Sequence, residues 1–373
     1  MTATSCTAPA PRPRARSYGL AIGQLPPGPF NAITDVAGVM VGHCTLWGEP
    51  DIRTGVTAIL PHPGNLFRDK VEAAIYQVNG FGKPTGLAQV AELGQIETPI
   101  VLTNTLSVGV AFDAVVRYLL THNPEIGVTT GTVNPVIFEC NDGHLNDIRG
   151  GHVTKEHVWQ AITSAASGPV PAGAVGAGTG MTAFGFKGGI GTSSRQVNTG
   201  AGQFTVGVLV LANFGRRTDL RIDGVPVGIA LADWKDDPAL PPGSVVVVVA
   251  TDAPLDSRQL GRLARRAAIG LARTGSTASN GSGDFVVAFS TTRRTPHFFD
   301  SPLRTVTGLI DDGETTGLLF GAAIESTEEA VLDALFCATS VQGRNQHYVP
   351  ALPVDEVLKI MAAHGRLPSA QTP

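Results

Sequence analysis

Long apolar runs in the second half of the chain predict strands that are buried on both faces of a sheet. They occupy residues 204–212 (FTVGVLVLA), 244–250 (SVVVVVA) and 285–289 (FVVAF). Continuous β-branched runs of this length are typical of central strands. A shorter run at residues 100–102, which begins after Pro99, predicts a further buried strand.

Apolar residues also recur at helical spacing. Between Leu260 and Leu271 they fall on one face, and arginines occupy the opposite face, so we expect an amphipathic helix that packs on a sheet. Asp252 is the expected N-cap of this helix, with Pro254 in its first turn. Further helices are expected over residues 111–120 and from near Ser326 to residue 336. The pattern therefore predicts an α/β protein.

The composition indicates a folded protein and narrows its partners. Of the 373 residues, 43% are hydrophobic and 16% are charged, against about 25% charged in an average globular protein. The net charge of −4 provides no basic surface for nucleic acid. No apolar run approaches the roughly 18–20 residues of a membrane span. We therefore expect neither a nucleic acid nor a membrane as a partner.

The sequence also indicates no metal ion or cofactor. The four cysteines lie far apart, which predicts free buried thiols, and the nine histidines show no compact ligand spacing. The glycine-rich stretch 171–195 contains G-A-G-T-G, but no clear strand precedes it. Lys187 is followed by Gly188 rather than by Ser or Thr, so a nucleotide-binding loop is not expected either. The glycines are expected to allow close backbone packing.

Residues 1–17 (MTATSCTAPAPRPRARS) differ in composition from the rest of the chain. They are rich in Pro, Ala and Thr, contain three arginines and lack the apolar core of a secretory signal. We predict that they form a disordered tail, that residues 18–373 form a single domain, and that the protein is cytoplasmic.

The start of the valine-rich run carries the first candidate for chemistry. A serine at such a junction is commonly just the first residue of a strand, but Gly243-Ser244 also fits a self-processing hydrolase. Gly243 has no side chain to shield its carbonyl, which the Ser244 hydroxyl could attack. Cleavage would make Ser244 a new N-terminus, whose α-amine, with a pKa of ~7.7–8.0, could deprotonate its own hydroxyl near neutral pH.

Further polar residues lie close to predicted strand ends. Ser282 and Asp284 precede the run 285–289 and could orient a nucleophile and carry protons if that strand neighbours Ser244. Asn213 follows the run 204–212, and its amide is a donor of the type that stabilises an oxyanion. The carboxylate of Glu139 could bind a substrate ammonium. Each of these residues also fits an ordinary turn.

Ordered sequence blocks extend over nearly the whole chain after the tail. They are residues 31–39 (NAITDVAGV), 53–61 (RTGVTAILP), 178–181 (GTGM), 186–192 (FKGGIGT) and 249–255 (VATDAPL). Together they resemble the self-processing L-aminopeptidase/D-esterases and β-peptidyl aminopeptidases of the DmpA and BapA type. The resemblance implies a four-layer αββα sandwich, similar to N-terminal nucleophile hydrolases but with different connectivity.

The resemblance also implies how the chain matures and which residues react. It implies self-cleavage between Gly243 and Ser244 into an α chain (1–243) and a β chain (244–373), which assemble as a homo-oligomer, a tetramer of αβ units. Ser244 matches the nucleophile of the family. The remaining matches are the serine and acidic partners and the oxyanion-site asparagine, namely Ser282, Asp284 and Asn213.

Two residues are assigned to substrate binding by the same resemblance. Glu139 matches a pocket glutamate that meets the amino group of the substrate, and Asn141 stands where the D-esterase member has a tyrosine. The expected reaction releases an N-terminal L-, D-Ala-type or β-amino acid from short peptides, amides or esters through an acyl-enzyme. Two alternatives stay open: an amidase for other ω-amino or cyclic amide substrates, and a non-catalytic, unprocessed homologue.

Overall fold

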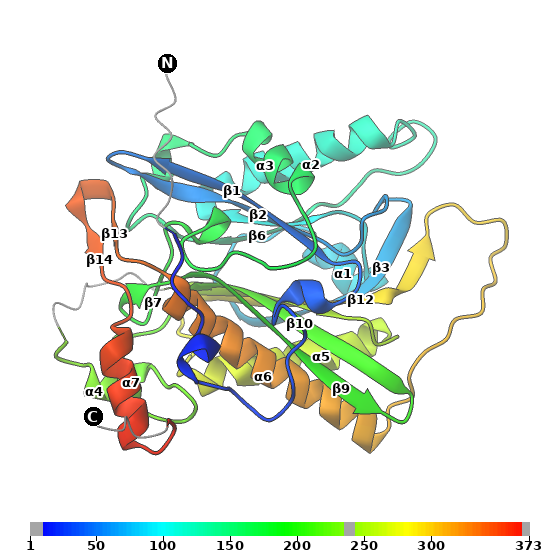
Figure 1. Ribbon diagram of the computed structural model, residues 1–373. Helices are drawn as coiled ribbons and strands as arrows, with labels where there is room; N and C mark the ends of the chain where they lie inside the picture. The colour runs from blue at the N-terminus through cyan, green and yellow to red at the C-terminus, as the bar shows by residue number, and fades with distance from the viewer. Residues whose placement is uncertain (1–9, 235–242, 368–373) are drawn as a thin grey trace.

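Two β-sheets packed face to face form the centre of the computed structural model, which describes residues 10–234 and 243–367 (Figure 1). The four-stranded sheet has the order β1 (Met40–Gly48), β2 (Ile52–Leu60), β5 (Ile100–Asn104), β6 (Val136–Cys140). The six-stranded sheet has the order β4 (Gln95–Ile96), β3 (Asp69–Gly80), β12 (Gly283–Pro296), β11 (Ser244–Thr251), β10 (Gly202–Asn213), β9 (Gly189–Thr199). Two short pairs are β7 (Thr182–Ala183) with β8 (Phe186–Lys187), and β13 (Val341–Gln342) with β14 (Tyr348–Val349).

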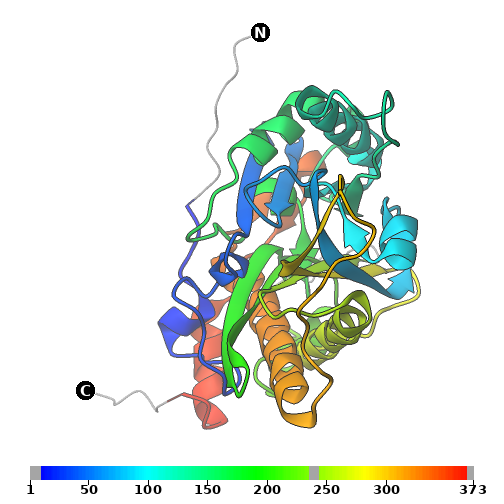
Figure 2. The ribbon, with the colours of Figure 1, turned by 90° about the vertical axis from the view of Figure 1, so that its right-hand side faces the viewer.

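Helices cover the outer face of each sheet, so that the molecule has four layers (Figures 1 and 2). On the four-stranded sheet lie α2 (Val108–His122) and α3 (Lys155–Thr163), and on the six-stranded sheet lie α5 (Ser257–Arg273) and α6 (Gly313–Cys337). Shorter helices are α1 (Leu87–Leu93), α4 (Val227–Ala230) and α7 (Val354–Ala363). None of the helices in the described part of the chain is long and apolar enough to span a membrane. The expected αββα sandwich is confirmed.

The valine-rich strand β11 explains how the layers are held together. Val246 and Val248 belong to the core between the two sheets, whereas Val245, Val247 and Val249 belong to the core under α5 and α6. Because successive side chains of a strand point to opposite faces, a strand between two cores must be apolar at every position. Burying each of these side chains stabilises the fold by roughly 1.5–3 kcal/mol.

The register of the six-stranded sheet brings three strand ends together. Strand β11 runs antiparallel to β10, with Asn213 opposite Ser244, and parallel to β12, with Gly283 opposite Ser244. The C-terminal end of β10 and the N-terminal ends of β11 and β12 therefore meet at one edge. This meeting point depends on strand pairing between segments that are distant in sequence.

Two helix boundaries differ from the predictions. Helix α5 begins at Ser257 and is capped by Asp256, whose side chain accepts a hydrogen bond from the Gln259 N–H at 2.7 Å. Asp252 instead accepts a hydrogen bond from the Thr205 N–H, which ties β10 to the end of β11. Helix α6 begins at Gly313, after the N-cap Asp312, whose side chain accepts a hydrogen bond from the Thr315 N–H, and not near Ser326. The sequence does not reveal its first three turns, because they carry glycine and threonine and lie nearer the surface.

The prediction of a disordered tail is wrong for residues 10–17. Arg14 and Arg16 form ion pairs with the buried carboxylates of Asp333 and Glu329 on α6, and Ala15 is fully buried. These carboxylates lie more than 300 residues further along the chain, so the basic segment is ordered by partners that local composition does not reveal. Residues 1–9 lie outside the described part of the chain. The described cysteines, Cys44, Cys140 and Cys337, are buried and free as predicted, and Cys6 is not described.

Candidate active site

Ser244 lies at the meeting point of the three strands. Its side chain is buried, and its hydroxyl forms no well-formed hydrogen bond with any residue of the described chain. Gly243 packs directly on the end of β10, where a Cβ atom would clash with the backbone carbonyl of Asn213 and lie 2.6 Å from the Phe214 Cα. Only glycine fits before Ser244 in this arrangement.

A serine and a carboxylate lie at the start of β12, the strand next to Ser244: Ser282 directly precedes this strand and Asp284 is its second residue. The Ser282 hydroxyl donates a hydrogen bond to Asp284 Oδ1 at 2.5 Å, and both side chains are buried. Burial raises the pKa of Asp284, while hydrogen bonds from Ser282 and from the Val245 N–H oppose this rise. The Val245 contact brings the carboxylate to within one residue of Ser244. Asp284 Oδ2 is buried and has no partner among the described residues.

Asn213 is fixed from both sides by backbone groups. Its Oδ1 accepts a hydrogen bond from the Thr182 N–H at 2.9 Å, and its Nδ2 donates to the Asn141 carbonyl at 3.1 Å. These bonds determine which end of the amide is the donor. Because the amide nitrogen carries two hydrogens, one N–H remains for a further acceptor next to Ser244.

The four-stranded sheet contributes Glu139 from the end of β6. One carboxylate oxygen accepts a hydrogen bond from the Lys83 N–H at 3.0 Å, and the other accepts one from the Thr105 hydroxyl. Asn141, two residues further on, binds Asn213 through its carbonyl, so the ends of the two sheets meet here. The side chain of Asn141 folds back onto its own turn and accepts a hydrogen bond from the Gly143 N–H at 2.8 Å.

Cys140 lies between these groups and was not singled out as a site residue from the sequence. Burial raises the pKa of its thiol well above the usual value, and the carboxylates of Glu139 and Asp284 raise it further. The neighbouring Ser244 hydroxyl opposes this shift. The thiol is therefore a neutral group beside the serine.

A buried lysine supports the loop that holds Asn213, and from the sequence it was considered only for a nucleotide-binding loop. Lys187 donates hydrogen bonds to the carbonyls of Gly178 (2.9 Å), Met181 (2.7 Å) and Gly188 (2.9 Å). Burial lowers its pKa, and the nearby Asp142 opposes this shift. The sequence block 186–192 was the available signal, but its glycines had suggested only a packing loop.

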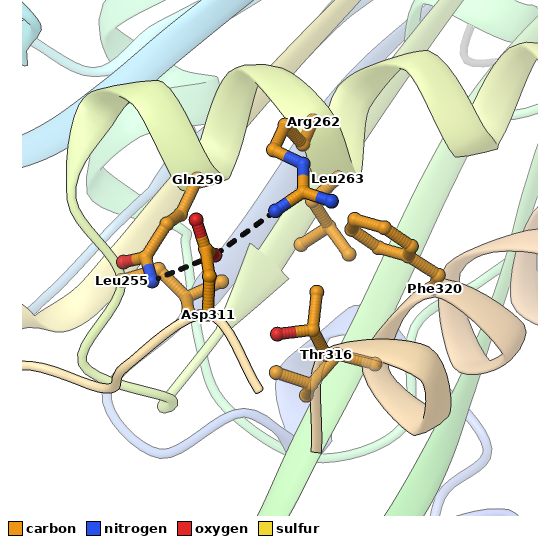
Figure 3. Close-up of a pocket in the computed structure, with 8 residues that line it drawn as sticks. Leu255, Gln259, Arg262, Leu263, Asp311, Thr316 and Phe320 are labelled. Carbon is orange, nitrogen blue, oxygen red and sulfur yellow. Dashed lines mark hydrogen bonds and ion pairs between the residues drawn. The ribbon is translucent and has the colours of Figure 1, made fainter. Parts of the chain in front are cut away.

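Two other features of the molecule are separate from this cluster. Nowhere in residues 10–234 and 243–367 do three or more His, Cys, Asp or Glu side chains form a group that could hold a metal ion. A small pocket lies between α5 and the start of α6 (Figure 3). The residues that line it include Leu255, Arg262, Asp311 and Phe320. Leu255 follows the C-terminal end of β11, whereas Ser244 begins it, so the pocket lies at the opposite end of the strand.

Residues 31–349 match the sequence profile of peptidase family S58. The chain belongs to this family. It is 42% identical over 381 residues to the β-peptidyl aminopeptidase BapA of Sphingosinicella microcystinivorans, covering 96% of this chain and 94% of that one. The predicted family, and with it the identification as an aminopeptidase, is confirmed.

Solved structures agree with this assignment. A Pyrococcus horikoshii OT3 protein has 51% sequence identity and a TM-score of 0.90, covering 95% of this chain and 100% of that one. The L-aminopeptidase D-Ala-esterase/amidase of Ochrobactrum anthropi has 40% identity and a TM-score of 0.89 with the same coverage, and is described as a serine aminopeptidase with a variant of the Ntn hydrolase fold. These solved structures therefore also confirm the predicted fold class.

Proposed function

We propose that the chain cuts its own Gly243–Ser244 bond and that Ser244 then serves as the nucleophile of the aminopeptidase. The observation that carries this proposal is the pairing of Ser244 with Asn213 on one side and Gly283 on the other. In the cut, the Ser244 oxygen bonds to the Gly243 carbonyl carbon and the C–N bond breaks. The proton of the hydroxyl passes to the departing nitrogen, which becomes the new α-amine. Water then hydrolyses the ester to a carboxylate on Gly243 and regenerates the Ser244 hydroxyl.

The proposed catalytic cycle uses the amine that the cut creates. The α-amine of Ser244, with a reference pKa of ~7.7–8.0, takes the proton of the attacking hydroxyl. The second N–H of Asn213 donates to the oxyanion of the tetrahedral intermediate. The α-ammonium then protonates the leaving amine or alcohol, and water releases the acyl group. Asp284, held by Ser282 and reached by the Val245 N–H, is suited to orient the ammonium.

We further propose that Glu139 binds the free amino group of the substrate. Glu139 lies next to the last residue of β6, its side chain is buried, and its two oxygens are already oriented by Lys83 and Thr105. Substrates would then be short peptides, amides or esters with a free N-terminal amine. The relatives are a β-peptidyl aminopeptidase and an L-aminopeptidase D-Ala-esterase/amidase, so β-aminoacyl, L-aminoacyl and D-alanyl compounds are the substrates to compare.

The decisive test is the intact mass of the purified protein under denaturing conditions, with N-terminal sequencing. The proposal expects two fragments, one of which begins Ser-Val-Val-Val. Ser244→Ala should remain a single chain and lose hydrolysis of aminoacyl p-nitroanilides, whereas Ser301→Ala, which removes an exposed hydroxyl in the segment between β12 and α6, should be cut and active. Full hydrolysis by Ser244→Ala would remove the nucleophile assignment.

We also propose that processed αβ units assemble as a tetramer and that the protein is cytoplasmic. The segment between β12 and α6 extends away from the body of the molecule (Figure 1). It exposes several large apolar side chains, an arrangement typical of a surface that contacts another protein: Phe298, Phe299, Leu303 and Ile310. Analytical ultracentrifugation of the purified protein tests the assembly, and a stable monomer would contradict it.

A further inference from the structure

A short segment at the end of β3 joins the two halves of the site. The Phe81 N–H donates to the Ser282 carbonyl at 3.3 Å, and two residues later the Lys83 N–H donates to Glu139 Oε1 at 3.0 Å. Residues 81–83, here called the lip, therefore extend from the turn at Ser282, before β12 of the six-stranded sheet, to the carboxylate of Glu139 on β6 of the four-stranded sheet. Asn79 supports the same turn by donating to the carbonyls of Ser279 (3.0 Å) and Asn280 (3.2 Å).

The backbone of the lip is pressed against both sides of the site. A Cβ atom on Gly82 would lie 2.6 Å from the Phe285 ring and 3.2 Å from Glu139 Oε1. A Cβ atom on Gly283, the strand partner of Ser244, would lie 2.9 Å from the Phe81 carbonyl oxygen. The lip is thus built into the site, and its position is set by contacts on both sides.

Two exposed apolar side chains lie close in sequence to the residues that hold Glu139. Phe81 is 64% exposed and Leu106 is 61% exposed. Phe81 lies two residues before Lys83, whose backbone N–H donates to one carboxylate oxygen of Glu139. Leu106 directly follows Thr105, whose hydroxyl donates to the other oxygen. Ligand sites are commonly lined by apolar and aromatic side chains around a few polar groups that fix orientation. Here the polar group is Glu139.

The ammonium group of Lys83 lies next to the Phe81 ring. Lys83 Nζ lies 5.1 Å from the centroid of Phe81, within the range of a cation–π contact. A second cation brought to this place would meet Lys83 as a like charge. The surroundings of Glu139 thus combine apolar surface with a charge that disfavours basic side chains.

We propose that Phe81 and Leu106 bind the side chain of the aminoacyl residue and that Lys83 excludes basic ones. This inference rests on the proposed function, because it takes Glu139 as the site of the substrate amine and Ser244 as the nucleophile. An aminoacyl group that spans these two residues carries its side chain past the lip. The preferred substrates are therefore compounds whose N-terminal residue is aromatic or aliphatic, and lysyl and arginyl compounds are poor substrates.

The test compares p-nitroanilides of phenylalanine, alanine and lysine, in the α or β form that the wild-type enzyme cleaves faster. Phe81→Ala should lower the phenylalanyl-to-alanyl ratio of kcat/KM about tenfold, mainly through KM, and Phe81→Leu should restore most of it. Phe30→Ala is the matched control, because Phe30 is also exposed (43%) but adjoins Asn31, which contacts Ser194 of β9 away from the strand end that carries Asn213. It should leave the ratio unchanged.

The charge is tested separately. Lys83→Met should raise the lysyl-to-alanyl ratio about fivefold at low salt, and the gain should shrink at high salt because exposed charges are screened. Lys155→Met is the matched control, since Lys155 Nζ lies at the same 5.1 Å from the Trp159 ring on α3. It should not change the ratio.

The outcomes separate this inference from the proposed function. A phenylalanyl-to-alanyl ratio that changes less than twofold in Phe81→Ala overturns the role of the lip, even when Ser244→Ala is inactive. Activity retained by Ser244→Ala overturns the nucleophile instead. Dissociation of the assembly in Phe81→Ala, with an unchanged ratio, would assign Phe81 to a contact between copies of the chain and would likewise overturn the inference.

Discussion

Replacing Asn213 by alanine tests the proposed oxyanion donor most directly. The side chain has two kinds of contact, a structural pair with the Thr182 N–H (2.9 Å) and the Asn141 carbonyl (3.1 Å), and the remaining N–H that we assign to the oxyanion. Loss of one oxyanion donor lowers kcat by roughly 10²–10³, or about 2.7–4 kcal/mol. Leaving two buried backbone groups without partners also lowers the free energy of unfolding by about 1–3 kcal/mol each.

The two effects can be separated with a matched asparagine. Asn123 is also buried, accepts a hydrogen bond from Asn65 Nδ2 at 2.6 Å and donates one to the Leu119 carbonyl at 3.0 Å. It follows α2, whose 15 residues extend about 22 Å from the end near Glu139. Asn123→Ala should therefore lose comparable stability in a urea titration while keeping kcat within about twofold.

The assay is the steady-state hydrolysis of an aminoacyl p-nitroanilide, normalised to the cleaved fraction measured by intact mass. Asn213→Ala should show both a lower kcat and slower self-cleavage, because the same N–H would stabilise both oxyanions. A kcat that falls less than about fivefold per cleaved molecule, with the stability loss of Asn123→Ala, would refute the oxyanion assignment and leave Asn213 with a structural role only.

Three further predictions concern His43, Arg195 and Gly243. Burial lowers the pKa of His43 to about 4, so the folded state resists protonation of this side chain. The free energy of unfolding should therefore fall by up to about 3 kcal/mol as the pH drops from 6.5 to 4. Urea titrations at several pH values should show that His43→Gln loses this dependence. Arg195 is fully buried and pairs with Glu329 at 2.6 Å, so Arg195→Met should cost about 3–5 kcal/mol, and a thermal shift below 2 °C would contradict this. Gly243→Ala should slow self-cleavage at least tenfold in a mass time course, because a Cβ atom would displace the scissile bond from Asn213.

The strands were more predictable than the helix starts. The runs at 204–212 and 244–250 lie inside β10 and β11 because each strand has apolar cores on both faces. The start of α6 was missed because its first turns, GETTGLLF, are only partly buried and show little apolar periodicity, and its N-cap, Asp312, lies in a segment rich in turn residues. Helical pattern was visible only where the helix is buried.

The sequence suggests candidate site residues one by one but not how they are arranged in space. Ser282 and Asp284 looked like part of a turn, and only the parallel pairing of β12 with β11 brings them beside Ser244. Lys187 and Asp142 were not predicted as interacting charges, because they are 45 residues apart in sequence and approach each other only through folding. Burial of a lysine on three carbonyls leaves no local pattern in the sequence.

The position of Gly243 links the two reactions that we assign to the site. In the intact chain, Gly243 is packed on the Asn213 backbone, so the chain itself occupies the space beside Ser244 that an external substrate would need. The Gly243 carbonyl directly precedes Ser244 in the chain, so in the proposed cut it would meet the same hydroxyl and the same amide that would act on an external substrate. In the first reaction the site would therefore cleave a peptide bond of its own chain. Cleavage would free the new C-terminus at Gly243 and so make the site accessible to external substrates. On this argument Ser244 and Asn213 serve both reactions, whereas Gly243 serves only the first.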